Sequence, residues 1–247
     1  MLPRITSCIP GVDDLLNGGF PEQRCIVLQG GPGSGKTTFA LQFIYEGAVK
    51  EEQPGIYITL SESPDEIREN NKASHGWDLA ELEKKGILKI VDARPVIASR
   101  EGLITPNERL FKGELLPFSH LLQLTVQSIN KAKAKRLALD SLTVLTMQYA
   151  NRFYVRQGVL GLIQALSSLD CTSLLLVEDL AEEKGLPIEL AIAPGAIVLR
   201  YERKGDVMTR SFQILKMRGV KHSLQFYHME IDDSGIRVFP EEAAMSK

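Results

Sequence analysis

Residues 30–37 have the composition and spacing of a phosphate-binding loop. They read Gly-Gly-Pro-Gly-Ser-Gly-Lys-Thr and fit the pattern G-x-x-x-x-G-K-[ST] at every fixed position. Glycines let the backbone turn where side chains would clash, so that successive N–H groups point inward toward an anion. Lys36 can then reach the β- and γ-phosphates of a nucleotide, and the Thr37 hydroxyl can hold Mg²⁺.

The flanks of this loop have the periodicity that a phosphate site needs. Residues 25–28 form a short apolar run, typical of a buried parallel strand, and apolar residues recur at helical spacing after Lys36. A glycine-rich turn that binds nothing is the alternative, and the agreement of strand, loop and helix counts against it. The residues expected to contact the phosphates are Gly31, Pro32, Gly33, Ser34, Gly35, Lys36, Thr37 and Thr38.

Asp140 ends the apolar run 137–140, well downstream of the loop. A buried strand that finishes in aspartate has the shape of a Walker-B element, whose carboxylate holds Mg²⁺, usually through a water. Short strands ending in Asp are common, so Asp140 gains its weight from the phosphate loop. Thr37 and Asp140 are therefore the predicted metal ligands.

Glu62 follows a second β-rich run, 56–60, and precedes a helix that begins with Ser63 as cap and Glu66 three residues later. In an open parallel sheet the ligand crevice lies outside the carboxyl ends of the strands. Glu62 is thus a candidate for contacting the nucleotide or its attacking water. A solvated loop carboxylate is the alternative.

The remaining periodicity alternates strands with helices. Further buried strands are predicted at 87–91 and 173–178, and helices at 77–85, 121–129 and 155–169. From Ala196 the pattern changes to strands alone, at 196–199, 207–216, 224–231 and 236–239. We expect one α/β domain over residues 1–247, with a mainly parallel sheet flanked by helices and an antiparallel C-terminal β extension.

Composition narrows the range of partners. The 29 Lys and Arg against 31 Asp and Glu give a net charge of −2, so no broad basic field favours nonspecific nucleic-acid binding. The basic run 131–136 is expected to favour a helix C-terminus, and a nucleic-acid patch is the alternative. No apolar run approaches the ~20 residues of a membrane span, and the N-terminus lacks a signal-peptide pattern. We expect a cytoplasmic protein.

The cysteines and histidines do not have metal-site spacing. Cys8, Cys25 and Cys171 include no C-x-x-C pair, and they are expected to be reduced packing residues. The four histidines show no i,i+4 pair, which argues against a protein-ligated zinc.

Once these elements are placed, the chain resembles a single-domain KaiC-like ATPase of the RecA/RadA superfamily nearly from end to end. The resemblance is carried by residues 9–13 with 17–19, the phosphate loop 30–37, the segment 60–64, the Walker-B segment 139–143, and by 216–219 and 235–240. It implies a RecA-like P-loop core with ATP and Mg²⁺ as ligands.

The family forms ring-shaped hexamers with ATP between subunits. The resemblance therefore implies a homo-oligomer in which Lys216 and Arg218 act in trans on the neighbour's γ-phosphate, and in which His222 lies near the ribose. From the residues alone, Lys216 and Arg218 are two basic residues near a strand end. The catalytic set implied is Glu62, Lys36, Lys216 and Arg218.

One departure from the family pattern bears on activity. Members with strong activity carry two acidic residues after the second strand, whereas this chain has Ser61 and Glu62. If the first position holds the water-activating base, hydrolysis is slow; if Glu62 takes the role, activity survives.

These features predict a Mg²⁺-dependent ATPase that hydrolyses ATP at the subunit interfaces of an oligomer and has a regulatory or signalling role. A DNA-binding recombination or repair accessory, using loops 93–117 or 179–187, is one alternative, disfavoured by the net charge. A P-loop phosphotransferase is a second, for which no acceptor motif is visible. A GTPase is disfavoured because no N-K-x-D segment follows Asp140.

Overall fold

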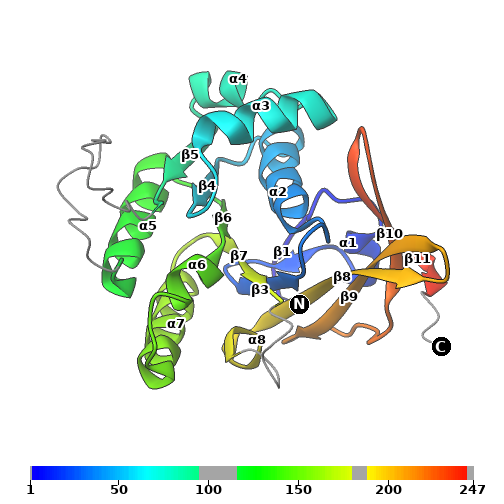
Figure 1. The fold of residues 1–247 in the computed structure, drawn as a ribbon. Helices are drawn as coiled ribbons and strands as arrows, with labels where there is room; N and C mark the ends of the chain where they lie inside the picture. The colour runs from blue at the N-terminus through cyan, green and yellow to red at the C-terminus, as the bar shows by residue number, and fades with distance from the viewer. Residues whose placement is uncertain (1, 95–115, 180–187, 244–247) are drawn as a thin grey trace.

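The computed structural model describes residues 2–94, 116–179 and 188–243. Their main feature is a nine-stranded sheet in the order β11-β10-β9-β8-β3-β7-β6-β4-β5 (Figure 1). Six neighbouring strands run parallel: β3 (Cys25–Gly30), β4 (Gly55–Thr59), β5 (Leu88–Asp92), β6 (Arg136–Asp140), β7 (Thr172–Glu178) and β8 (Gly195–Lys204).

The C-terminal strands extend this sheet in antiparallel fashion. They are β9 (Val207–Met217), β10 (Tyr227–Asp232) and β11 (Gly235–Ala243). A separate two-stranded ribbon joins β1 (Arg4–Ile5) to β2 (Phe20–Pro21). The predicted fold class, a mainly parallel sheet with an antiparallel C-terminal extension, is confirmed.

Helices cover both faces of the sheet. One apolar cluster contains side chains of α1 (Val12–Leu15), α2 (Lys36–Lys50), α3 (Pro64–His75) and α4 (Leu79–Lys84). The other contains side chains of α5 (Phe118–Ala132), α6 (Leu142–Thr146), α7 (Arg152–Leu166) and α8 (Ile188–Ile192). Successive residues of β3 alternate between the two clusters, which explains why this central strand is apolar throughout.

Several boundaries differ from the predicted ones. The sequence pattern missed α6 and α8, which have five residues each, too few to show a helical period. It placed the start of β10 at Leu224, whereas the strand begins at Tyr227 and Leu224 is exposed. The predicted loops 93–117 and 179–187 lie mostly outside the described residues.

The last charge of the basic run, Arg136, is not on the surface. It opens β6 and is fully buried, and its guanidinium donates to Phe43 O at 3.0 Å and to Gln53 Oε1 at 2.9 Å. Gly47 on α2 leaves the space that the guanidinium occupies. The expectation that the whole run serves a helix C-terminus is therefore wrong for Arg136, because strand pairing carries this residue inward under α2.

Among the helices in the described part of the chain, none combines the length and the apolar character needed to cross a bilayer.

Candidate active site

The glycine loop connects β3 to α2 at the carboxyl edge of the parallel sheet, where sequence reasoning expected a ligand crevice. Gly33 and Gly35 have φ values of 73° and 98°, in the left-handed region that disfavours other residues. A Cβ at Gly35 would lie 2.7 Å from Cδ1 of Ile231 on β10, whereas a Cβ at Gly31 would meet nothing within 4 Å. The loop is therefore packed against the sheet at Gly35 and open at Gly31.

Lys36, the first residue of α2, folds its side chain back into the loop. Its Nζ donates to the carbonyl oxygens of Gly30 at 2.8 Å and Gly31 at 3.1 Å. Burial lowers the pKa of the ammonium group, and the carboxylates of Glu178, Asp140 and Asp179 oppose that shift. A positive group thus lies against the main chain of the loop at the N-terminus of α2, and helix N-termini attract phosphate anions.

Asp140 and Thr37 meet at the start of α2. Thr37 Oγ1 donates to Asp140 Oδ2 at 2.7 Å, although the two residues are 103 positions apart. Asp140 is 6% exposed, and the peptide bond that follows it is cis. A hydroxyl and a carboxylate are the oxygen ligands that Mg²⁺ prefers, so this donor set fits the predicted metal.

Tyr57 is a member of this group that sequence reasoning missed. Its hydroxyl donates to the same Asp140 Oδ2 at 2.6 Å, and its side chain is almost fully buried in β4. Burial and the neighbouring Asp140 carboxylate hold the pKa of the phenol well above its usual value, so the phenol is a neutral donor. In the sequence Tyr57 looked like one more apolar strand residue, and only strand pairing shows its polar end.

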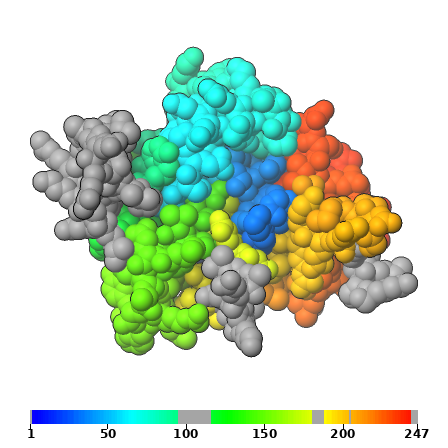
Figure 2. All heavy atoms as spheres, in the orientation of Figure 1, coloured from blue at the N-terminus to red at the C-terminus, as the bar shows by residue number. Residues whose placement is uncertain are grey.

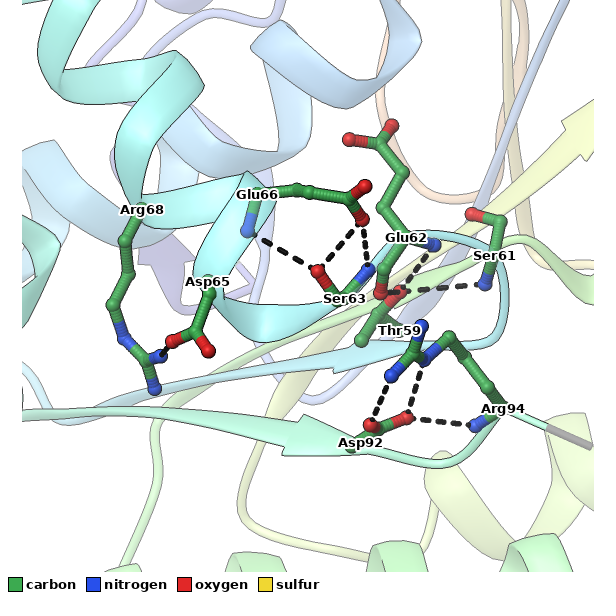
Figure 3. A network of polar contacts seen from close by, with 9 residues as sticks. All are labelled: Thr59, Ser61, Glu62, Ser63, Asp65, Glu66, Arg68, Asp92 and Arg94. Carbon is green, nitrogen blue, oxygen red and sulfur yellow. Dashed lines mark hydrogen bonds and ion pairs between the residues drawn. The ribbon is translucent and has the colours of Figure 1, made fainter. Parts of the chain in front are cut away.

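Glu62 lies where the sequence placed it, just beyond β4. Thr59 Oγ1 donates to Glu62 O at 2.7 Å and accepts from Glu62 N at 3.1 Å, so the backbone of this turn is closed. The carboxylate of Glu62 extends away from the turn and from its neighbours in Figure 3. Partial burial raises the pKa of Glu62, and the Asp140 and Glu66 carboxylates raise it further.

The surroundings of Glu62 are held by polar pairs (Figure 3). Ser63 and Glu66 form the predicted capping box, in which Ser63 N donates to Glu66 Oε2 at 2.9 Å and Glu66 N donates to Ser63 Oγ at 3.2 Å. Arg94 donates to both carboxylate oxygens of Asp92, at 2.9 and 2.7 Å. Ser61, which directly precedes Glu62, is exposed.

A cavity of about 410 Å³ adjoins the loop, within the range of small-ligand sites. It lies between α2, the end of α3 and the C-terminal strands, and Figure 2 shows the blue atoms of early α2 reaching the surface between these cyan and orange parts. The phosphate-loop motif predicts only the lining residues in the loop and in α2. The remaining lining residues come from distant segments without a motif: Ser74, His75, Arg210 and Ile231.

Arg210 on β9 connects the C-terminal strands to the phosphate loop. Its Nε donates to Gly33 O at 3.0 Å, and its guanidinium lies 4.6 Å from the ring centre of Tyr201. The Tyr201 ring packs beneath Gly33, where an added Cβ would lie 3.2 Å away. The antiparallel extension therefore contributes directly to the candidate site, a role that its strand pattern did not indicate.

Two further acids lie at the tip of β7. Glu178 pairs in register with Gly30, and its main-chain N–H donates to Thr143 Oγ1 at 2.8 Å. Asp179 Oδ1 accepts from Gln29 Nε2 at 3.2 Å. Together with Asp140 they give the surroundings of Lys36 a negative potential.

Lys216, Arg218 and His222 are not brought to the phosphate loop of their own chain. Lys216 pairs with Ala196, which pairs with Val27 in the middle of β3, and its Nζ donates to Leu190 O at 2.7 Å. His222 Nε2 accepts from Met217 N at 3.1 Å. Their expected roles in nucleotide binding or catalysis stay predictions.

Three features define the class of this protein: a glycine loop with an inward lysine, a hydroxyl–carboxylate pair, and a mainly parallel sheet with an antiparallel extension. This class is that of RecA-like, P-loop, ATP-binding proteins. Comparison with known proteins agrees. The family model for the KaiC ATPase matches residues 5–243. This chain therefore belongs to the KaiC family of ATPases.

Several relatives align over nearly the whole chain. A UPF0273 protein from Methanopyrus kandleri is 37% identical over 242 residues, which cover 97% of this chain and 93% of the relative. The circadian clock oscillator protein KaiC of Synechococcus elongatus is 32% identical over 97% of this chain, which spans 44% of that protein. The crystal structure of a KaiC-like protein from Pyrococcus horikoshii superposes with a TM-score of 0.81 at 34% identity, covering 97% of this chain and all of that chain.

Proposed function

We propose that this protein binds ATP together with Mg²⁺ and hydrolyses it between the subunits of a homo-oligomer. The contact of 2.7 Å between Thr37 Oγ1 and Asp140 Oδ2 carries the proposal. It brings the two oxygen ligands of a divalent cation to the first turn of α2, next to the inward ammonium of Lys36. A glycine turn without a nucleotide role would not need this pairing.

The loop residues bind the phosphates in this proposal. Lys36 Nζ exchanges the carbonyls of Gly30 and Gly31 for phosphate oxygens, while the main-chain amides of the loop and the N-terminus of α2 face the same anion. Thr37 and Asp140 hold Mg²⁺, which when bound supplies positive charge to the phosphate oxygens. The Thr37 hydroxyl can offer a lone pair to the metal and still donate its proton to Asp140.

Glu62 is the proposed base that orients the attacking water and takes its proton. Partial burial and two neighbouring carboxylates raise the pKa of Glu62, which makes it a stronger base than an ordinary glutamate. The nucleobase and the ribose are proposed to occupy the cavity lined by Thr38, His75 and Arg210, because this cavity adjoins the loop on the side of the C-terminal strands.

The substitution Lys36→Ala tests this function, because it removes the ammonium group that contacts the loop carbonyls. Turnover of ATP is expected to fall by about 100-fold or more, the order seen when one positioned donor is removed from a reacting site. Lys50→Ala is the matched control, since Lys50 lies on the same helix and forms an ion pair with Glu46 at the helix surface. Phosphate release that is equal in wild type and Lys36→Ala would contradict the proposal.

The oligomeric part of the proposal concerns Lys216, Arg218 and His222. Their own strand register keeps Lys216 away from the loop of the same chain, which supports a role toward a neighbouring subunit, where Lys216 and Arg218 act on the γ-phosphate and His222 lies near the ribose. A hexameric ring, as in the family that the chain resembles, fits this arrangement. A positive group supplied from outside stabilises charge as the phosphoryl group leaves.

Mixed oligomers test the sharing of sites. Arg218→Ala chains mixed with Lys36→Ala chains are expected to recover phosphate release, because some interfaces then combine an intact loop with an intact Arg218. Each variant alone is the control, and light scattering with and without Mg-ATP gives the oligomer size. Mixtures no more active than the separate variants would argue against shared sites.

A regulatory or signalling role, in a cytoplasmic setting, is the proposed use of the ATP cycle, and the name of the clock relative from Synechococcus elongatus supports it. Repeating the phosphate-release assay with DNA present separates this proposal from a DNA-binding accessory, for which hydrolysis would rise with DNA. ATP loss without matching phosphate release would point to phosphotransfer instead.

A further inference from the structure

The hydroxyl of Tyr57 is the donor that reaches Asp140 from inside the sheet. Tyr57 lies in the middle of β4, where it pairs with Ala138 on β6 and Ile90 on β5, and its ring belongs to the apolar cluster beneath α2. The side chain is buried in this cluster, with 1% of its surface exposed, so the hydroxyl has little freedom to move. It donates to Asp140 Oδ2 at 2.6 Å.

Among the described residues, two side chains donate hydrogen bonds to the Asp140 carboxylate, and the two converge on one oxygen. Thr37 and Tyr57 donate to Oδ2, at 2.7 and 2.6 Å, and no described residue donates a side-chain hydrogen bond to Oδ1. Two donors on the same oxygen, one from α2 and one from β4, fix the rotation of the carboxyl group. Oδ1 then keeps its lone pairs for another ligand.

We propose that Tyr57 is a positioning residue for the metal site, which orients the Asp140 carboxylate so that Oδ1 is left for a water bound to Mg²⁺. This inference rests on the proposed function and adds to it a residue that no motif marks. The simpler role is that a buried tyrosine finds an acceptor wherever it packs. The two roles differ in what happens to metal dependence when the hydroxyl is removed.

The test is the substitution Tyr57→Phe, which deletes only the hydroxyl and leaves the ring and the Thr37 contact in place. Binding of a non-hydrolysable ATP analogue is measured by calorimetry at a series of Mg²⁺ concentrations and in EDTA. The positioning role predicts that the Mg²⁺ concentration for half-maximal tight binding rises by about tenfold, the order expected for one hydrogen bond to a charged acceptor. Affinity in EDTA should stay unchanged.

Tyr149→Phe is the matched control, because the Tyr149 hydroxyl also makes a 2.6 Å hydrogen bond, to Leu116 O, away from the loop. Its metal dependence should equal that of wild type. Thermal unfolding of both variants checks that they fold. In an Asp140→Asn background, Tyr57→Phe should have no further effect on metal dependence, since the carboxylate that it orients is gone.

The outcomes separate the two proposals. In the first outcome, wild-type protein binds the analogue more tightly with Mg²⁺, and the Tyr57→Phe variant has the same metal dependence. This result leaves the proposed function standing and overturns only the role of Tyr57. Equal weakening of binding in Mg²⁺ and in EDTA also overturns it, because that is the result of a purely structural change. Wild-type protein that binds no analogue in either buffer overturns the proposed function, and the role of Tyr57 with it.

Discussion

The two acidic groups near the phosphate loop are held in different ways. Asp140 is buried and accepts hydrogen bonds from Thr37 and Tyr57 on two different elements. Glu62 is half-buried, and in the described chain only its main chain is hydrogen bonded, to Thr59. The side proposed to bind the metal is therefore held by hydrogen bonds, whereas the side proposed to meet the attacking water has a carboxylate without a side-chain hydrogen bond in the described chain.

This difference suits the two proposed tasks, metal binding by Asp140 and proton transfer by Glu62. A metal ligand must keep its geometry, and hydrogen bonds from packed elements provide that. A base must accept a proton and then release it, so fixed donors on its oxygens would compete with the water. The raised pKa of Glu62 has the same origin, because burial and like charges act on a carboxylate that no hydrogen-bond donor of the described residues compensates.

Asp140→Asn gives the largest expected effect, because it removes the charge on the fixed side. Turnover should fall by about 1,000-fold, since the divalent cation and its charge on the phosphates are both affected. Nucleotide affinity in EDTA should change little. Asp170→Asn, which alters an exposed aspartate paired with Lys135 near the opposite edge of the sheet, is the control. Comparable turnover in Asp140→Asn and wild type would contradict the proposed role of Asp140 as a metal ligand.

Glu62→Gln should lower turnover by about 100-fold, the lower end of what a general base contributes, and leave the affinity for Mg-nucleotide unchanged. The exposed Glu69 on α3 allows the same change as a control.

The pH profile of turnover sharpens this prediction. A general base must be deprotonated to act, and burial raises the pKa of Glu62. As the pH falls, turnover should therefore begin to decline at a pH above about 4.3, the ordinary pKa of a glutamate. Glu62→Gln should remove that decline. A wild-type profile that is flat down to the ordinary range, or one that Glu62→Gln leaves intact, would show that Glu62 is not the base.

Ser61→Glu gives the smallest expected effect and tests the departure from the family pair. With Glu62 as base, an added carboxylate at the exposed position 61 should change turnover by less than about threefold, because water and salt screen it. A rise of about tenfold, equivalent to ~1.4 kcal/mol of barrier, would assign the base to the first position instead.

The parts of the candidate site that could be predicted are those that depend on short local sequence patterns. The loop, the capping box at Ser63 and the acid at the end of β6 each follow from local patterns, and strand pairing then places them at one edge. The fold class followed in the same way from alternating strands and helices. These predictions needed no knowledge of which strand neighbours which.

The residues that were missed act through partners far along the chain. Tyr57 reaches Asp140 because β4 lies beside β6, and Arg210 reaches Gly33 because the C-terminal strands fold back beside the loop. For Arg136 the prediction was wrong in the other direction. The basic run predicted a charge at a helix C-terminus, whereas the guanidinium is buried under α2. In each case the sequence contains the residue but not the strand order that gives it its neighbour.

Calorimetry of the pure, folded protein with a non-hydrolysable ATP analogue tests the central claim most directly. A loop that encloses Lys36 beside the Thr37–Asp140 pair predicts saturable binding, tighter with Mg²⁺ than in EDTA. Absence of binding heat in both buffers at several temperatures would contradict the account.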